Sequence, residues 1–168
     1  MSAERRLGEL GIDLPPPRPA SANFVRAKQV GNILYVSGHG PSRQDGSRVT
    51  GRVGSDLTLD EGYQAARLVG VGILSTVRNA LGSLDRVRQI VKAFGMVNSA
   101  PGFDQQAEVL DGFSDLMVAV FGEGGRHART AVGVATLPRG ISVDVEVVIE
   151  VESTVAISAV ARERRGSA

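Results

Sequence analysis

The chain has 168 residues, a length typical of one domain, and with 42% hydrophobic but only 4% aromatic residues its core must be aliphatic. Its 19 basic and 18 acidic residues give a net charge of +1, which provides no field to attract nucleic acid or an anionic membrane. The sequence has no cysteine, which excludes disulfides, thiolate metal sites and a cysteine nucleophile. No apolar run has the roughly 18 residues of a membrane-spanning helix, and no apolar signal region follows Arg5 and Arg6, so we expect a cytoplasmic protein.

The first 22 residues are predicted to form an N-terminal arm. Three consecutive prolines at 15–17 favour an extended polyproline conformation. Leu7, Leu10 and Leu14 could hold a short helix against the body, and a loosely ordered tail is an equally good interpretation.

Two short strands are predicted next, at residues 24–28 and 33–37. Gly31 and Asn32 between them are typical of a hairpin turn. The segment 37–41, Ser-Gly-His-Gly-Pro, should end the second strand, and its glycines would let the backbone approach a ligand closely. A plain turn is the alternative.

Capping residues and the spacing of apolar residues predict two helices. Thr58 and Glu61 fit a capping box, apolar residues then recur every three or four positions up to Leu81, and Gly82 suits the C-cap. The second helix is predicted at about 104–121. Between the two lies an apolar strand at 87–97.

That strand is expected to be covered on both sides. Its apolar residues fall at both parities, which is typical of a strand with two buried faces. The helices can cover one face, and a chain this short has little left for the other, so we expect a neighbouring subunit there. The expected faces are Val91, Ala93 and Val97 on one side, and Ile90, Phe94 and Met96 on the other.

Two strands end the predicted domain. An apolar strand follows Arg129 and ends before Pro138, which has no backbone N–H to give to a sheet. Residues 142–152 alternate strictly, with five aliphatic side chains on one face and mostly carboxylates on the other. The order β-β-α-β-α-β-β predicts an α+β domain at 23–155 with both helices on one sheet face, followed by a polar C-terminal tail at 156–168.

The sequence resembles the RidA/YjgF family of reactive imine and enamine deaminases, part of which is also labelled endoribonuclease L-PSP. The resemblance implies a chorismate-mutase-like fold and a homotrimer whose sheets form a central barrel, with three ligand clefts between subunits. Its motifs are Ala128-Arg129-Thr130, an apolar strand to Ala135, Leu137-Pro138, the alternating strand 143–151, Asn23-Phe24-Val25, Gly31-Asn32 and Ser37-Gly38.

The resemblance also implies a chemistry. In this family an arginine, matched here by Arg129, holds the carboxylate of a small 2-imino or 2-enamino acid, for which its planar fork of donors is suited. Water adds to the imine carbon and ammonia leaves, giving a 2-oxo acid. Catalytic candidates are Arg129 and Asp144, and the substrate-binding candidates are Phe24, Ser37, Gly38, His39, Asp111, Arg129 and Ala131.

Four matched positions differ from the residues common in active deaminases. Phe24 replaces a tyrosine, Asp111 an asparagine, Ala131 a cysteine that helps to hold the water, and Asp144 a glutamate. The carboxylate clamp is thus kept and the groups that handle water are altered.

Other functions stay open. A trimeric module that binds small carboxylates without turnover is the main alternative. A chorismate-mutase-like rearrangement would require several cations, of which only Arg129 is identified, and a ribonuclease would require a basic surface. His39 and His127 lack metal-ligand spacing, so no metal or cofactor is expected.

Overall fold

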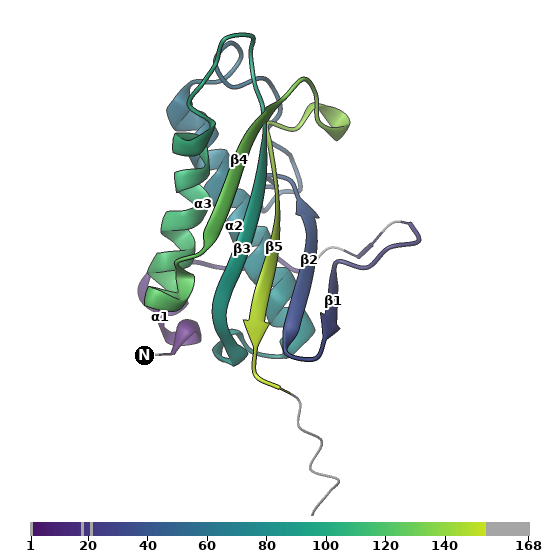
Figure 1. Ribbon diagram of the computed structural model, residues 1–168, viewed down its shortest axis with the longest axis vertical. Helices are drawn as coiled ribbons and strands as arrows, with labels where there is room; N and C mark the ends of the chain where they lie inside the picture. The colour runs from purple at the N-terminus through teal and green to yellow at the C-terminus, as the bar shows by residue number, and fades with distance from the viewer. Residues whose placement is uncertain (1, 18, 21, 154–168) are drawn as a thin grey trace, which may run out of the picture.

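One five-stranded sheet, packed on one side by two long helices, forms the body of the protein (Figure 1). The computed structural model describes residues 2–17, 19, 20 and 22–153. The strand order is β1-β2-β5-β3-β4, and every neighbouring pair is antiparallel except the parallel pair β3–β4. The strands and helices are β1 (Ala27–Val30), β2 (Ile33–His39), α2 (Leu59–Leu81), β3 (Val87–Asn98), α3 (Gln106–Phe121), β4 (Ala128–Val134) and β5 (Val143–Val151).

This order confirms the predicted α+β fold and its β-β-α-β-α-β-β sequence of elements. Three short 3₁₀ turns are added, η1 (Leu84–Arg86), η2 (Gly122–Gly125) and η3 (Pro138–Gly140). The first strand begins at Ala27 instead of residue 24, and the second helix at Gln106 instead of about 104. The predicted hairpin at Gly31 and Asn32 joins β1 to β2 as expected.

The capping box predicted for α2 is present. The Thr58 hydroxyl accepts a hydrogen bond from the Glu61 amide, and the Glu61 carboxylate accepts one from the Thr58 amide. At the other end Gly82 adopts the left-handed conformation of a C-cap. Helices α2 and α3 approach closely because Gly112 of α3 lies against the backbone of Tyr63, where a β-carbon would collide with the carbonyl.

The prediction for the faces of β3 was partly wrong. The register with β5 shifts twice, between Val87 and Gln89 and between Ile90 and Lys92. Each shift places an extra residue in β3, which reverses the alternation of its side chains. Ile90 therefore lies on the helix face with Ala93 and Val97, and Val91 is exposed.

The N-terminal arm begins with a helix, the first of the two interpretations considered. Helix α1 (Ala3–Glu9) buries Leu7 in the core, whereas Leu10 is exposed. Glu4 forms an ion pair with Arg78 of α2 and accepts a hydrogen bond from the Leu84 amide. The predicted polar tail at 156–168 lies outside the described residues.

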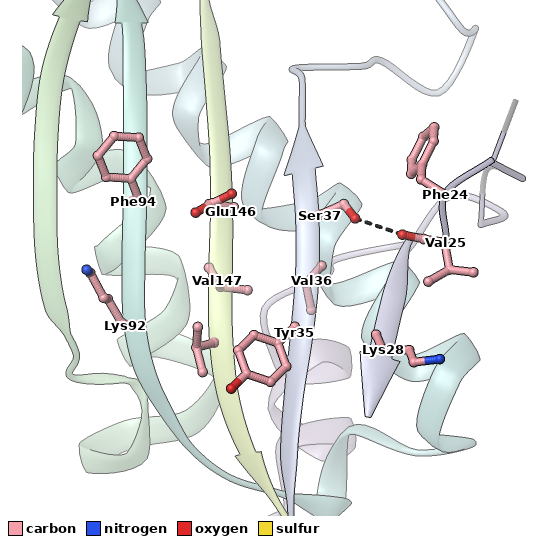
Figure 2. Close-up of a pocket in the computed structure, with 11 residues that line it drawn as sticks. Phe24, Val25, Lys28, Tyr35, Val36, Ser37, Lys92, Phe94, Glu146 and Val147 are labelled. Atoms are coloured by element: carbon pink, nitrogen blue, oxygen red, sulfur yellow. Dashed lines mark hydrogen bonds between the residues drawn. The ribbon is translucent and has the colours of Figure 1, made fainter. Parts of the chain in front are cut away.

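The sheet face turned away from the helices forms an open hollow of about 730 Å³ (Figure 2). Three side chains project from this face into the hollow, those of Phe94 of β3, Glu146 of β5 and Tyr35 of β2, and Tyr35 is half exposed. The apolar side chains of this face have no cover within the described chain. Among the described residues, no helix is long and apolar enough to cross a membrane.

Candidate functional site

Arg129 lies on β4, the edge strand of the sheet, and points toward helix α3. It is in register with Ala93, which is buried on the helix face. Its Nη1 donates hydrogen bonds to Asp111 Oδ1 at 2.8 Å and to Ser114 Oγ at 3.0 Å. The described part of the chain offers no hydrogen-bond partner to Nε or Nη2, and these two donors form one edge of the guanidinium fork. Arg129 is therefore held through one nitrogen, and the edge suited to a carboxylate remains free.

His127 and Ser114 support this arrangement. His127 donates from Nδ1 to the Gly125 carbonyl at 2.7 Å, and its Nε2 lies 3.1 Å from Ser114 Oγ. Burial lowers the pKa of His127, the Gly125 hydrogen bond opposes this, and the Arg129 charge lowers it further. A neutral His127 accepts from the Ser114 hydroxyl, whose oxygen then accepts from Arg129. Ser114 was missed in the sequence; its spacing of one helical turn from Asp111 was the available signal.

Ala131 follows Arg129 by two residues and shares its face of β4. It is half-buried and packs against the hydrophobic core. Its methyl group offers no hydrogen bond to a water molecule beside Arg129.

Asp144 lies on β5 and points to the opposite face of the sheet. Its neighbours Val143 and Val145 are fully buried toward the helices, so alternation turns Asp144 the other way. Its Oδ1 is buried and has no hydrogen-bond partner among the described residues. Burial, and then the charge of Glu146, raise the pKa of Asp144 from 3.8 to about 6, although Arg26 opposes them. A carboxyl group with this pKa can exchange protons near neutral pH.

Gly38, which follows Ser37 on β2, borders this carboxylate. A β-carbon on Gly38 would collide with Asp144 Oδ1, so only glycine allows the carboxylate this position. The Ser37 hydroxyl donates to the Val25 carbonyl at 2.7 Å, which fixes the segment before β1 (Figure 2). Phe24 in that segment is 44% exposed, and the Arg26 guanidinium lies 5.7 Å from its ring centre.

His39, the residue after Gly38 on β2, is buried against helix α2 and does not face the Asp144 carboxylate. Its Nδ1 donates to the Ser37 carbonyl at 2.6 Å, so its Nε2 accepts from the Thr76 hydroxyl at 2.8 Å. Burial lowers the pKa of His39, the Ser37 hydrogen bond opposes this, and Arg26 lowers it further. The neutral ring thus joins β2 to α2.

The expected site residues form two groups that one chain does not bring together. Arg129, Asp111 and Ala131 lie at the β4–α3 edge, whereas Phe24, Ser37, Gly38 and Asp144 lie near β2 and β5. Arg129 is level with Val147 across β3, three residues from Asp144 along β5. Standard strand spacings separate the two by roughly 10 Å along the strands and 10 Å across them, on opposite faces.

The described residues include no group of three or more histidine or acidic side chains that could hold a metal ion.

The fold and these residues define a chain of the YjgF and chorismate-mutase class. Residues 4–150 match the family described as "YjgF/chorismate_mutase-like, putative endoribonuclease", and the chain belongs to that family. This confirms the resemblance found in the sequence, with a divergent member as expected.

The chain is also similar to individual proteins over most of its length. The chain is 45% identical over 148 residues to Protein TCP17 of Trypanosoma cruzi, covering 88% of this chain and 92% of the relative. It is similar to the structure of protein Atu1372 from Agrobacterium tumefaciens, with 43% identity, a TM-score of 0.82 and coverage of 90% and 94% of the two chains. A structure from Shewanella oneidensis, described as a "putative endoribonuclease", gives 33% identity, a TM-score of 0.86 and coverage of 90% and 100%.

Proposed function

We propose that the protein is a deaminase of small reactive 2-imino and 2-enamino acids that acts in clefts between copies of the chain. The observation that carries the proposal is Asp144, a buried carboxyl group without a hydrogen-bond partner among the described residues and with a pKa of about 6. A structural carboxylate is normally paired, whereas an acid–base group requires this balance between its charged and neutral forms.

Arg129 supplies the second requirement, which is a grip on the substrate. Its Nε and Nη2 edge is suited to a bidentate bond with the carboxylate of the imino acid. Asp111 and Ser114 hold Nη1 and so fix the plane of the guanidinium. This preset geometry reduces the conformational entropy that the side chain loses when it binds.

The distance between Arg129 and Asp144 within one chain implies that the active site forms between copies of the chain. Both groups can act on one small molecule only if they come from different copies, with the β4 edge of one near β2 and β5 of the next. A contact between two different surfaces generates a ring when its rotation closes and an open filament when it does not, and the family resemblance implies the closed homotrimer. The uncovered apolar face in Figure 2 would line the central barrel.

The reaction follows from these positions. Asp144 of one copy takes a proton from a water molecule, which adds to the imine carbon of a substrate held by Arg129 of its neighbour. The carboxyl proton then passes to the nitrogen of the adduct, which gives a carbinolamine. The carbinolamine hydroxyl next gives its proton, through the same carboxylate, to the amino group as the carbonyl forms and the C–N bond breaks. Ammonia leaves, and the 2-oxo acid remains bound to Arg129 until it dissociates.

A non-catalytic binding module for small carboxylates is the second candidate. The observation in its favour is Ala131, which offers no polar group to hold the attacking water. Such a module would keep the Arg129 grip and would bind pyruvate without accelerating any hydrolysis.

Ammonia release from freshly generated iminopropanoate, with semicarbazide as a competing trap for the imine, tests the proposal. We expect the wild type to exceed the spontaneous rate. Arg129→Lys should raise KM about tenfold or more, because a charge-assisted hydrogen bond is worth roughly 1.5–3 kcal/mol. Arg126→Lys is the matched control, since Arg126 forms an exposed ion pair with Glu123. A wild type that binds pyruvate but releases ammonia no faster than the spontaneous reaction would favour the binding module instead.

A further inference from the structure

A second cavity, of about 760 Å³, lies on the helix side of the sheet. Its walls are the proline segment of the arm, the end of β2, the loop after it, the middle of α2 and the turn η3. This volume is within the range of small-molecule sites. Ser75 of α2 donates to the Pro15 carbonyl at 2.6 Å, which fixes the proline wall against the helix.

The lining of this cavity has one sign of charge. Four arginines contribute to it, Arg26, Arg43, Arg48 and Arg139, and no aspartate or glutamate occurs among the described lining residues. The whole chain has a net charge of only +1, so positive charge is concentrated here. A concave surface lined by one sign of charge raises the local concentration of counter-ions.

Arg139 has an unusual backbone. It adopts φ 60° and ψ 20°, and it is the only non-glycine residue with positive φ in the described ranges. A β-carbon makes this left-handed conformation unfavourable, and such residues concentrate at ligand sites. Within the part of the chain that the structure describes, no carboxylate forms an ion pair with Arg139.

Arg26 contributes a donor that lacks a partner. Its Nε is buried and has no hydrogen-bond acceptor among residues 2–17, 19, 20 and 22–153. Its guanidinium lies over the Phe24 ring, which also lines the cavity. A buried donor without an acceptor is rare in folded proteins, and a bound anion would satisfy it.

Asp144, Arg43 and the pair of His39 and Thr76 also set the charge around the cavity. The Asp144 carboxylate lies against the lining residue Gly38 and interacts with Arg26, so it offsets part of the arginine charge. Arg43 donates to Ser47 Oγ and to the Arg48 carbonyl, both at 3.4 Å. The pKa of exposed Asp45 is lowered mainly by its hydrogen bonds from Ser47, and the charge of Arg43 adds to this effect. His39 and Thr76, a neutral hydrogen-bonded pair, also line the cavity and add no negative charge to it.

We propose that this cavity binds a small organic dianion, either a phosphate monoester or a dicarboxylate. Arg26, Arg43 and Arg139 hold the charged groups, and the prolines and Phe24 contact the carbon skeleton. The cavity includes Phe24, Gly38 and His39, so it adjoins the Asp144 side of the proposed cleft, whereas Arg129 lies outside it. The dianion differs from the monocarboxylate assigned to Arg129, and its binding is measured without turnover.

Calorimetry with three probes that share one ring tests this assignment. Phenyl phosphate and phthalate carry two charges at pH 8, and benzoate carries one. We expect at least one dianion to bind ten times more tightly than benzoate, and the stronger of the two identifies the charged group. Absence of binding by both dianions at millimolar concentration, or affinity equal to that of benzoate, would overturn the proposal.

Variants locate the site. Arg139→Gly removes the guanidinium and suits the left-handed backbone, so the protein should stay folded while its dianion affinity falls at least tenfold. Arg26→Gln should weaken binding similarly, and Arg126→Gln, outside the cavity, should leave it unchanged. Arg129→Lys should weaken benzoate alone. Dianion affinity that survives both Arg139→Gly and Arg26→Gln in folded protein would refute the assignment.

Discussion

The carboxylate oxygen Oδ1 of Asp144 lies against the Cα of Gly38, in the space that a β-carbon would fill. These residues come from β5 and β2, neighbours in the sheet but far apart in sequence. The contact explains why a glycine follows Ser37 at this place: the carboxylate can be buried here only because Gly38 has no side chain.

Gly38→Ala should therefore displace Asp144. The methyl group would push the carboxylate toward solvent, which would lower its pKa from about 6 toward 3.8. We expect deamination to slow by roughly 10²-fold, the lower end of the contribution of a positioned acid–base group. The acid limb of the pH–rate profile should move to lower pH, whereas Gly31→Ala, at a hairpin turn, should leave that limb in place. A profile that stays unchanged in Gly38→Ala would remove Asp144 from the mechanism.

Asp144→Asn should stabilise the protein while it abolishes activity. The folded pKa of Asp144 lies above the unfolded value, so its ionisation destabilises the folded state as pH rises from about 4 to about 6. Above pH 6 the full penalty is present, and below pH 4 there is none. Discounted for partial exposure, the gain in the free energy of unfolding should be about 1–2 kcal/mol at pH 7.5.

Denaturant unfolding at pH 7.5 and pH 4 measures this difference. Glu152→Gln, which removes an exposed carboxylate just beyond the same strand, is the control. Equal or lower stability of Asp144→Asn at pH 7.5 would show that the Asp144 charge is not destabilising.

Asp111→Asn should strengthen carboxylate binding. Asp111 is half exposed and places a negative charge 2.8 Å from Arg129 Nη1, while asparagine keeps an oxygen acceptor without the charge. We expect pyruvate to bind about two to five times more tightly, in line with the small energy of exposed ion pairs. Asp115→Asn is the matched control, because Asp115 lies one turn further along α3 and accepts from the Tyr63 hydroxyl. Weaker pyruvate binding by Asp111→Asn would mean that the ion pair positions Arg129.

Light scattering should show a trimer, three times the chain mass of 17.6 kDa. Tyr35 is 51% exposed on the open sheet face, so Tyr35→Asp should place a charge in the proposed barrel and shift the protein toward monomers. Leu10→Asp changes a similarly exposed apolar residue just after α1 and should leave the mass unchanged. A monomeric wild type at micromolar concentration would contradict the shared cleft.

Local patterns allowed much of the fold to be predicted. The capping box of α2 and the alternation of β5 depend on residues close in sequence, and both are present as expected. The faces of β3 were not predictable in this way, because two register shifts break its alternation without a glycine or proline signal.

The candidate site was predictable in its residue types but not in its arrangement. The motif identified Arg129 and Asp144, yet their opposite faces depend on sheet order and register, which are properties of the whole fold. The pairing of Asp111 with Arg129 is likewise a contact between α3 and β4. Arg139 carried no sequence signal, since its left-handed backbone is set by the turn η3.

Mixed assemblies test the central claim, that each site takes Arg129 from one copy and Asp144 from another. Arg129→Ala and Asp144→Asn chains, each inactive alone, are co-expressed in equal amounts with different tags, and mass spectrometry verifies mixed trimers. In a cyclic trimer with random mixing, about a quarter of the sites contain both wild-type residues, so about a quarter of wild-type ammonia release should return. Verified mixed trimers as inactive as their parents would contradict the claim.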